Sequence, residues 1–148
     1  MNYIQNILNL RHKKNNKLSA ALEPILGFTP KKIHYYERAF THRSTNKKDD
    51  QGNPFNYERL EYVGDAILGS VIAHYLYVSI LDANEGYLTK MRSKIVSRSH
   101  LNKIGEGLGL LALLDSKLDH DKFGDNIHGN LFEALVGAVF LDRGYSIS

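Results

Sequence analysis

The spacing of apolar residues is the feature that most constrains how this chain folds. Along most of its 148 residues, apolar side chains recur at intervals of three and four, and alternating stretches typical of strands are few and short. This pattern predicts a single domain built from helices alone. The expected helices cover residues 3–10, 18–26, 30–40, 57–81, 87–97, 99–107 and 127–142, and polar loops cover 43–54 and 115–126.

Two of the expected helices are strongly apolar, and both carry carboxylates. Glu58, Glu61 and Asp65 are spaced by three and then four residues, which places them on one helical face. Glu133 lies in the middle of helix 127–142, which is apolar on nearly every side and is expected to be buried all round. Carboxylates in such places repel one another and lose hydration, so a compensating partner is required.

Small residues accompany the carboxylates on both helices. Gly64 and Ala66 lie on the first helix, and Ala134, Gly137 and Ala138 lie on the last. Small side chains let two helix backbones approach closely, so we expect the helices to pack together and to bring the carboxylates into one place. The first of the two helices is expected to be central and well buried.

The residue types at this cluster favour a hard cation. The chain has no cysteine, and no histidine stands at metal-ligand spacing, so oxygen ligands favour Mg²⁺ or Mn²⁺ over Zn²⁺. Such sites serve phosphoryl transfer, and no Ser–His or Cys–His arrangement suggests a protein nucleophile. A solvated acidic face, or pairing with Arg59, is the structural alternative; the apolar character of both helices argues against it.

The net charge of +3 is small, but cations stand on both sides of the acidic cluster. This distribution suits a phosphate backbone held by cations while metal ions occupy the acidic centre. Scattered solvated lysines would give the same distribution, so charge alone decides nothing. The flanking cations are Lys13, Lys14, Lys17, Lys31 and Lys32 on one side and Lys90, Arg92, Lys94, Arg98 and Lys103 on the other.

No segment reads as a membrane anchor or an export signal. No apolar run approaches the roughly 20 residues that cross a bilayer. The first residues have their charges after the apolar part and show no small-residue cleavage site. We therefore expect a cytoplasmic protein with no membrane partner.

Four stretches resemble the signature motifs of the ribonuclease III family. NYERLEYVGDAIL at 56–68 is close to the family pattern N-x-E-R-L-E-F-L-G-D-[SA]-x-L. FTHRS at 40–44 resembles a T-H-R-S motif that precedes this signature. EGYLTKMRSKIVSRSHL at 85–101 and NLFEALVGAVFLDRGY at 130–145 resemble two motifs that follow it, in the same order.

The resemblance implies an all-α ribonuclease III endonuclease domain, a helical bundle that acts as a homodimer. It implies hydrolysis of double-stranded RNA with Mg²⁺, for which Mn²⁺ is a possible substitute, at two sites along the dimer interface. Products with 5′-phosphate and 3′-hydroxyl ends, and a role in RNA processing such as ribosomal RNA maturation, are implied as well.

The resemblance also assigns roles to the acidic residues. It implies that Glu61, Asp65 and Glu133 are metal ligands, with Asp65 and Glu133 also catalytic, and that Glu58 is an outer catalytic residue aiding RNA or metal–water contacts. The fourth metal position is Asn130, where the family usually has aspartate.

Five further residues become candidates for contacts with partners. Tyr62 stands where family members carry a phenylalanine that inserts into the partner subunit, although an ordinary core tyrosine is the alternative. His42 and Arg43 could contact phosphate or brace the polar loop, and bracing is slightly favoured. Arg92 and Lys94 are candidates for RNA contacts or for structural ion pairs.

Asn130 departs from the family pattern because it takes one negative charge from the site. We expect weaker metal affinity with chemistry retained; the alternatives are loss of activity and a deliberate substitution made to trap a complex. A catalytically weakened or silent RNA-binding and dimerisation module is therefore the second hypothesis. Asp125, in the preceding loop, is a candidate for supplying the missing charge.

The extent of the resemblance is the second departure. It covers about residues 18–145, which makes 1–17 an N-terminal extension and 18–148 the catalytic domain. Family members usually continue into a double-stranded-RNA-binding domain, and no stretch of this sequence resembles one. We expect a shortened protein or a degenerate gene product, with reduced RNA affinity because many phosphate contacts are missing.

Overall fold

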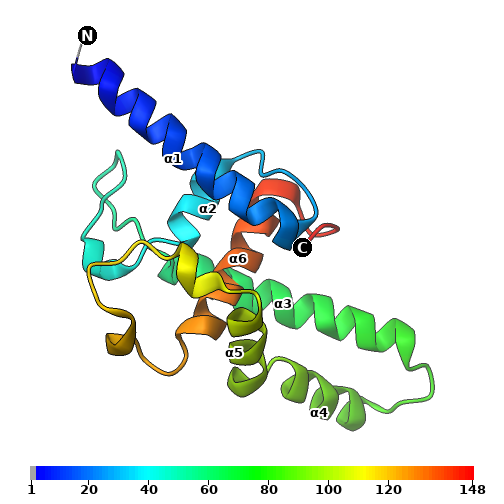
Figure 1. Cartoon of the computed structure of the whole chain (residues 1–148). Coiled ribbons are helices and arrows are strands. Elements are labelled where there is room, and N and C mark those ends of the chain that lie inside the picture. The colour runs from blue at the N-terminus through cyan, green and yellow to red at the C-terminus, as the bar shows by residue number, and fades with distance from the viewer. Residues whose placement is uncertain (1–2) are drawn as a thin grey trace.

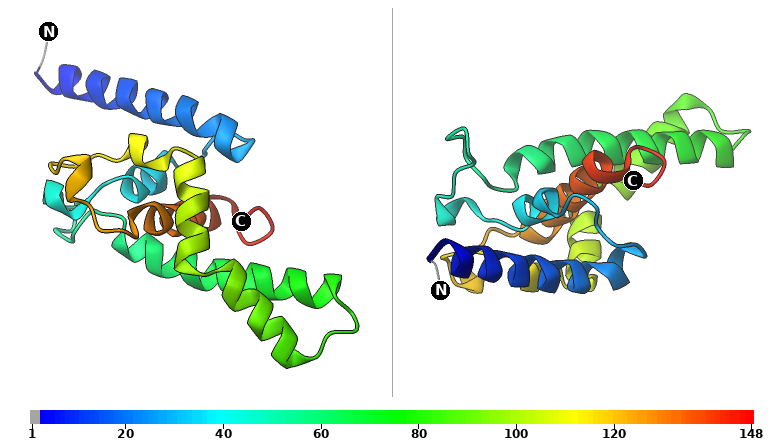
Figure 2. Two further views of the ribbon diagram at one scale, coloured as in Figure 1. Left: turned by 60° about the horizontal axis from the view of Figure 1, so that its bottom comes forward. Right: turned by 90° about the horizontal axis from the view of Figure 1, so that it is seen from above.

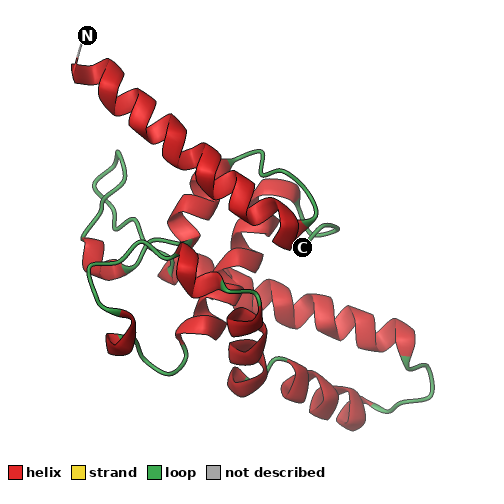
Figure 3. Cartoon of the chain, viewed as in Figure 1, coloured by secondary structure: helices red, strands yellow, loops and turns green. Residues whose placement is uncertain are grey.

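The structure, a computed structural model, describes residues 3–148 and is helical throughout its regular parts (Figure 3). Within these residues the only β-structure is two isolated bridges, which confirms the predicted all-α class. The α-helices are α1 (Tyr3–Leu26), α2 (Ile33–Ala39), α3 (Glu58–Ser79), α4 (Glu85–Ile95), α5 (Arg98–Gly107) and α6 (Ile127–Arg143), and the short 3-10 helices are η1 (Arg43–Thr45), η2 (Leu110–Leu113) and η3 (His120–Lys122).

Helix α6 is the centre of the fold. It packs against α3, α5 and α2, and in the view from above it lies between α3 and α1 (Figure 2). Its side chains Leu131, Ala134 and Ala138 are fully buried, together with Leu22 of α1 and Tyr36 of α2. The expectation that the last helix is buried on nearly every side is therefore confirmed.

Glycines set the close contact between α3 and α6. A Cβ atom on Gly64 would lie 1.6 Å from the main-chain oxygen of Glu133, and one on Gly137 would lie 2.3 Å from that of Leu60. Real Cβ atoms do not approach so closely, so both positions require glycine. The predicted packing of small residues is confirmed for these two glycines, whereas Ala66 is exposed and lies outside the contact.

The expectation that α3 is well buried was wrong. Only Leu60, Gly64 and Leu76 of this helix are buried. Tyr62 is 79% exposed and Tyr77 71%. Helix α6 covers one face of α3, and α4 runs back beside its outer half, so the two helices project together from the body (Figure 1). Helix α2 and the hydroxyl of Tyr145 also contact α3, and the rest of the helix forms a face that the described chain leaves exposed.

The first helix also differs from expectation. Two helices were predicted over 3–10 and 18–26, but α1 continues through the polar run between them. That run contains no glycine or proline, and lysine and arginine are good helix formers, so nothing interrupts the helix. The Nζ atom of Lys14 lies 2.9 Å from a carboxylate oxygen of Asp115, which ties the middle of α1 to the body.

Helix α2 begins later than predicted because the residues expected to start it bond elsewhere. Thr29 precedes the expected start at residue 30, but its hydroxyl donates to the carboxylate of Glu23 at 2.6 Å and therefore caps no helix there. The main-chain NH groups of Lys31 and Lys32 donate to the buried carboxylate of Asp142 at 3.1 and 2.8 Å. Asp142 thereby fixes the entry of α2 against the end of α6.

Within residues 3–148, no helix combines the length and apolar character that crossing a membrane requires.

Candidate functional site

Helices α3, α5 and α6 enclose a pocket of about 570 Å³, referred to below as the acidic pocket. It contains all five residues proposed as catalytic or metal-binding residues from the sequence, and Tyr62 lies at its edge. Its lining residues are Glu58, Glu61, Tyr62, Asp65, Val96, Arg98, Leu101, Asn102, Asn126, Gly129, Asn130 and Glu133.

The carboxylates of the acidic pocket disfavour one another's charge. Burial, followed by the charges of Asp65 and Glu61, raises the pKa of Glu133 to about 7. Burial and the charge of Glu58 raise the pKa of Glu61 as well. Arg98 opposes both increases without cancelling them. The pocket therefore holds more negative charge than its own residues neutralise.

This donor set has the chemistry of a site for a hard cation. Carboxylate and amide oxygens are the ligands that Mg²⁺ and Mn²⁺ prefer, and a cation would stabilise the charge of Glu133 against the burial and repulsion that raise its pKa. In the described chain, no three Asp, Glu or His side chains already converge closely enough to hold a metal ion. The residues thus fit a cation by type and place, and side-chain rotation would have to draw them together around it.

The raised pKa predicts how stability depends on pH in the absence of metal. The pKa of Glu133 is about 7 in the folded protein and 4.5 ordinarily, so the folded state binds more protons between these values. Stability therefore falls as the pH rises from about 4.5 to 7, by about 2 kcal/mol. Chemical unfolding with a chelator at pH 5 and 8 measures this loss.

Glu133→Gln is the matched variant for this measurement. It removes the titrating group, so the loss of stability between pH 5 and 8 should shrink by about 2 kcal/mol. A variant whose pH dependence matches that of the unmodified chain would show that Glu133 ionises without cost.

Asn102 of α5 positions the beginning of α6. Its side-chain oxygen accepts a hydrogen bond from the main-chain NH of Gly129 at 2.7 Å, and its amide donates to the main-chain oxygen of Asp125 at 3.0 Å. These bonds orient the turn of α6 that carries Asn130. Sequence reasoning missed Asn102, because bonds to main-chain atoms so far along the chain leave no local signal.

A second cavity of about 760 Å³ adjoins the acidic pocket and shares Glu58, Glu61, Asn126 and Asn130 with it. Asp125 lines this second cavity and is absent from the lining of the acidic pocket. The structure therefore does not bring Asp125 into the acidic pocket to replace the charge that Asn130 lacks.

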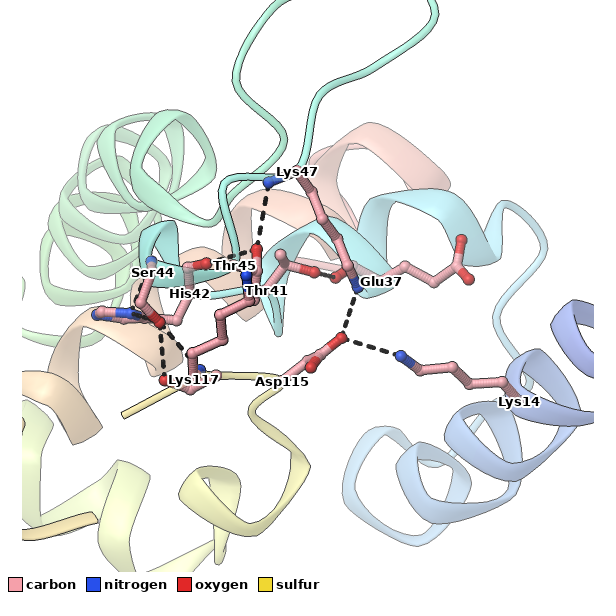
Figure 4. Close-up of polar contacts among 10 residues, drawn as sticks. Lys14, Glu37, Thr41, His42, Ser44, Thr45, Lys47, Asp115 and Lys117 are labelled. Atoms are coloured by element: carbon pink, nitrogen blue, oxygen red, sulfur yellow. Dashed lines mark hydrogen bonds and ion pairs between the residues drawn. The ribbon is translucent and has the colours of Figure 1, made fainter. Parts of the chain in front are cut away.

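His42 braces the polar loop, the alternative that was slightly favoured. It is only 7% exposed, and its Nδ1 accepts a hydrogen bond from the main-chain NH of Ser44 at 3.1 Å. The hydroxyl of Ser44 in turn accepts from the main-chain NH of Lys117, which links the two polar loops (Figure 4). Burial, then the charge of Arg43, lowers the pKa of His42. The ring is thus a neutral structural element.

The other candidates differ in their distance from the site. Arg43 is exposed and lies 3.5 Å from the carboxylate of Glu58, at the boundary between the two cavities. Arg92 and Lys94 are exposed on α4 and line neither cavity, so the structure does not bring them to the acidic residues. Tyr62, at 79% exposure, is not the core tyrosine that was the alternative for it.

Arg98 is the functional candidate that sequence reasoning overlooked. It was noted only as one of several flanking cations, yet it lines the acidic pocket. A signal was present, because it follows Ser97 at the start of a helix, where cations are unfavourable.

Comparison with known proteins points to one family. The ribonuclease-III-like family profile matches residues 32–147. The chain is 60% identical to ribonuclease 3 of Zunongwangia profunda and 56% identical to ribonuclease 3 of Flavobacterium psychrophilum. Each match covers 98% of the chain but only 60% and 59% of the relative, so the chain spans about three fifths of these relatives.

Solved structures agree. The nuclease domain of Campylobacter jejuni ribonuclease III, described with a flexible region involved in dimer formation, superposes with a TM-score of 0.72 at 29% identity, covering 85% of the chain and 87% of that domain. Dicer from Pichia stipitis superposes with a TM-score of 0.59 at 29% identity, covering 80% of the chain and 49% of Dicer.

Proposed function

The chain belongs to the ribonuclease III family, and on this basis we propose that it is a metal-dependent endoribonuclease that cleaves double-stranded RNA in the acidic pocket. The observation that carries the proposal is that four carboxylates from α3 and α6 line one pocket. Carboxylates that raise one another's pKa are costly to maintain, and a divalent cation offsets that cost.

Each acidic residue has a proposed role. Glu61, Asp65 and Glu133 hold a divalent cation, Mg²⁺ or Mn²⁺, and the side-chain oxygen of Asn130 completes the set. Glu58, at the mouth of the pocket and paired with Arg43, supports RNA binding. A bound cation supplies polarisation of the phosphodiester and activation of water. The protein residues orient the phosphodiester so that water breaks the bond between phosphorus and the 3′ oxygen. The products then carry 5′-phosphate and 3′-hydroxyl ends, in keeping with a role in RNA processing.

Incubation with long double-stranded RNA tests this proposal. The purified chain should cut the RNA with Mg²⁺ or Mn²⁺, be inactive with a chelator, and spare single-stranded RNA of the same sequence. The proposal fails if high protein concentrations leave the duplex intact with both metals.

The proposed activity is assigned to one part of the chain. We propose residues 18–148 as the catalytic domain and residues 1–17 as an N-terminal extension of it.

Asn130→Asp should increase metal affinity. The substitution restores the charge that most family members carry and keeps the geometry, because the two side chains have the same shape. A further carboxylate in a pocket with a partly protonated Glu133 should lower the Kd for Mn²⁺ by about tenfold, roughly 1.4 kcal/mol. Calorimetric titration of both proteins measures the difference.

An unchanged Kd for Asn130→Asp would show that this position does not contact the metal. A silent chain that Asn130→Asp activates would support the second candidate function, a ribonuclease III module that binds RNA without cutting it. The neutral Asn130 in the pocket is the observation that favours this alternative.

We further propose that the uncovered face of α3 pairs with a second copy of the chain. Exposed aromatic residues on this helix, Tyr62 among them, would gain burial in a homodimer. Tyr62→Asp should therefore shift sedimentation from dimer to monomer, because it places a charge in an apolar interface. A dimer as stable as that of the unmodified chain would exclude this face.

A further inference from the structure

Arg98 is the one cation among the side chains that line the acidic pocket. It is the first residue of α5, so it enters the pocket from a different helix than the carboxylates of α3 and α6. Carboxylates attract a divalent cation but repel the anionic phosphodiester. A pocket that must admit an anionic substrate therefore needs a cation of its own at the place where the phosphate enters.

Arg98 has no partner within the described part of the chain. Its guanidinium takes part in none of the ion pairs there, although carboxylates share its pocket. Arg43, which lines the adjoining cavity, by contrast already lies 3.5 Å from Glu58. Arg98 is thus the guanidinium that remains available to a ligand.

The fold does not explain an arginine at this position. Ser97 caps α5 by accepting a hydrogen bond from the main-chain NH of His100, and no acidic residue stands in the first turn. The helix dipole disfavours a cation at this end of a helix. The side chain is also exposed, so it adds little to packing. A residue that opposes local stability and has no structural partner indicates a functional constraint.

We propose that Arg98 binds the phosphate of the RNA strand that is cut, a role that rests on the proposed function. A guanidinium forms paired hydrogen bonds with phosphate oxygens, which fixes the orientation of the phosphate as well as its position. Before the metal and the RNA bind, the same charge partly neutralises Glu61 and Glu133 and limits the rise of their pKa values. A divalent cation takes over that neutralisation and leaves the guanidinium to the phosphate.

Three variants test this role: Arg98→Ala, Arg98→Lys and the control Lys117→Ala. Lys117 is exposed in the polar loop that follows η2, lines neither cavity, and its loss changes the net charge equally. Arg98→Ala should lower kcat/KM on double-stranded RNA by about tenfold or more, the value of a charge-assisted hydrogen bond. The kcat/KM of Arg98→Lys should lie between those of Arg98→Ala and the unmodified chain, and that of Lys117→Ala should stay within about twofold of the unmodified chain.

Titration with Mn²⁺ in the absence of RNA separates a phosphate ligand from a structural residue. Arg98→Ala should bind Mn²⁺ about threefold more tightly, because a cation has left the pocket, and its Tm should not fall. An Arg98→Ala variant that cleaves as fast as Lys117→Ala overturns the proposal. A variant that binds Mn²⁺ more weakly, or that melts early, also overturns it, because Arg98 would then support the metal ligands or the fold.

Binding measurements distinguish a failure of the proposed nuclease function from a failure of the phosphate contact of Arg98. If the unmodified chain does not cut RNA, the RNA affinity of Glu133→Gln can be compared with that of Glu133→Gln combined with Arg98→Ala. A weaker affinity in the double variant supports the phosphate contact without any cleavage, and equal affinities overturn it.

Discussion

Glu133→Gln is expected to abolish cleavage of double-stranded RNA while the fold remains intact. Glu133 lies where α6 faces α3, and burial, followed by the charges of Asp65 and Glu61, raises its pKa to about 7. Glutamine has the same shape but contributes no charge to a divalent cation. The loss of one charged ligand at a metal-assisted phosphoryl transfer should lower kcat/KM by about 10³-fold or more.

Cleavage rates with saturating Mn²⁺ measure this effect. Glu106→Gln is the control, because Glu106 is exposed on α5, lies outside both cavities and loses the same charge. Unfolding by denaturant shows that both variants are folded, and Glu133→Gln should be the more stable of the two at pH 8. Cleavage by Glu133→Gln within tenfold of the control would remove Glu133 from the reaction.

Gly64→Ala should have the largest effect on stability. Its new Cβ atom would lie 1.6 Å from the main-chain oxygen of Glu133, so α3 and α6 would have to move apart along their contact. Strain of this kind in a packed core costs about 3 kcal/mol, a large part of the total stability of a domain. The same movement displaces Glu133, so cleavage should fall even under conditions in which the variant is folded.

Gly69→Ala is the matched control for this substitution. Gly69 lies on the same helix, and a Cβ atom there would meet nothing within 4 Å. Alanine at a free helical position stabilises by about 0.5–1 kcal/mol, so the two variants should move Tm in opposite directions. Equal melting of the two proteins would show that the backbones of α3 and α6 are not in close contact at Gly64.

The helices that build the site could be predicted from the sequence because their signals are local. Helical periodicity located α3 and α6, and the small residues Gly64 and Gly137 predicted their close contact. The continuity of α1 was missed because a polar run without glycine or proline was read as a loop. The burial of α3 was overestimated because an apolar helix face gives no indication of which element covers it.

In the candidate site, too, the residues with a local sequence signal could be predicted and those without one could not. The spacing of Glu58, Glu61 and Asp65 predicted a common face, and the structure brings Glu133 to it. Asn102 could not be found in this way, because its hydrogen bond to Gly129 joins residues far apart in the chain. Arg98 could have been found, since an arginine directly after a helix cap is locally unfavourable.

Anomalous diffraction from crystals soaked in Mn²⁺ tests most directly whether the acidic pocket is a metal site. We expect a peak between α3 and α6, with Glu61, Asp65 and Glu133 drawn toward it, and no such peak in Glu133→Gln crystals soaked in the same way. A chain that cuts double-stranded RNA with Mn²⁺ but shows no peak in this pocket, or shows one elsewhere, would contradict the proposed site.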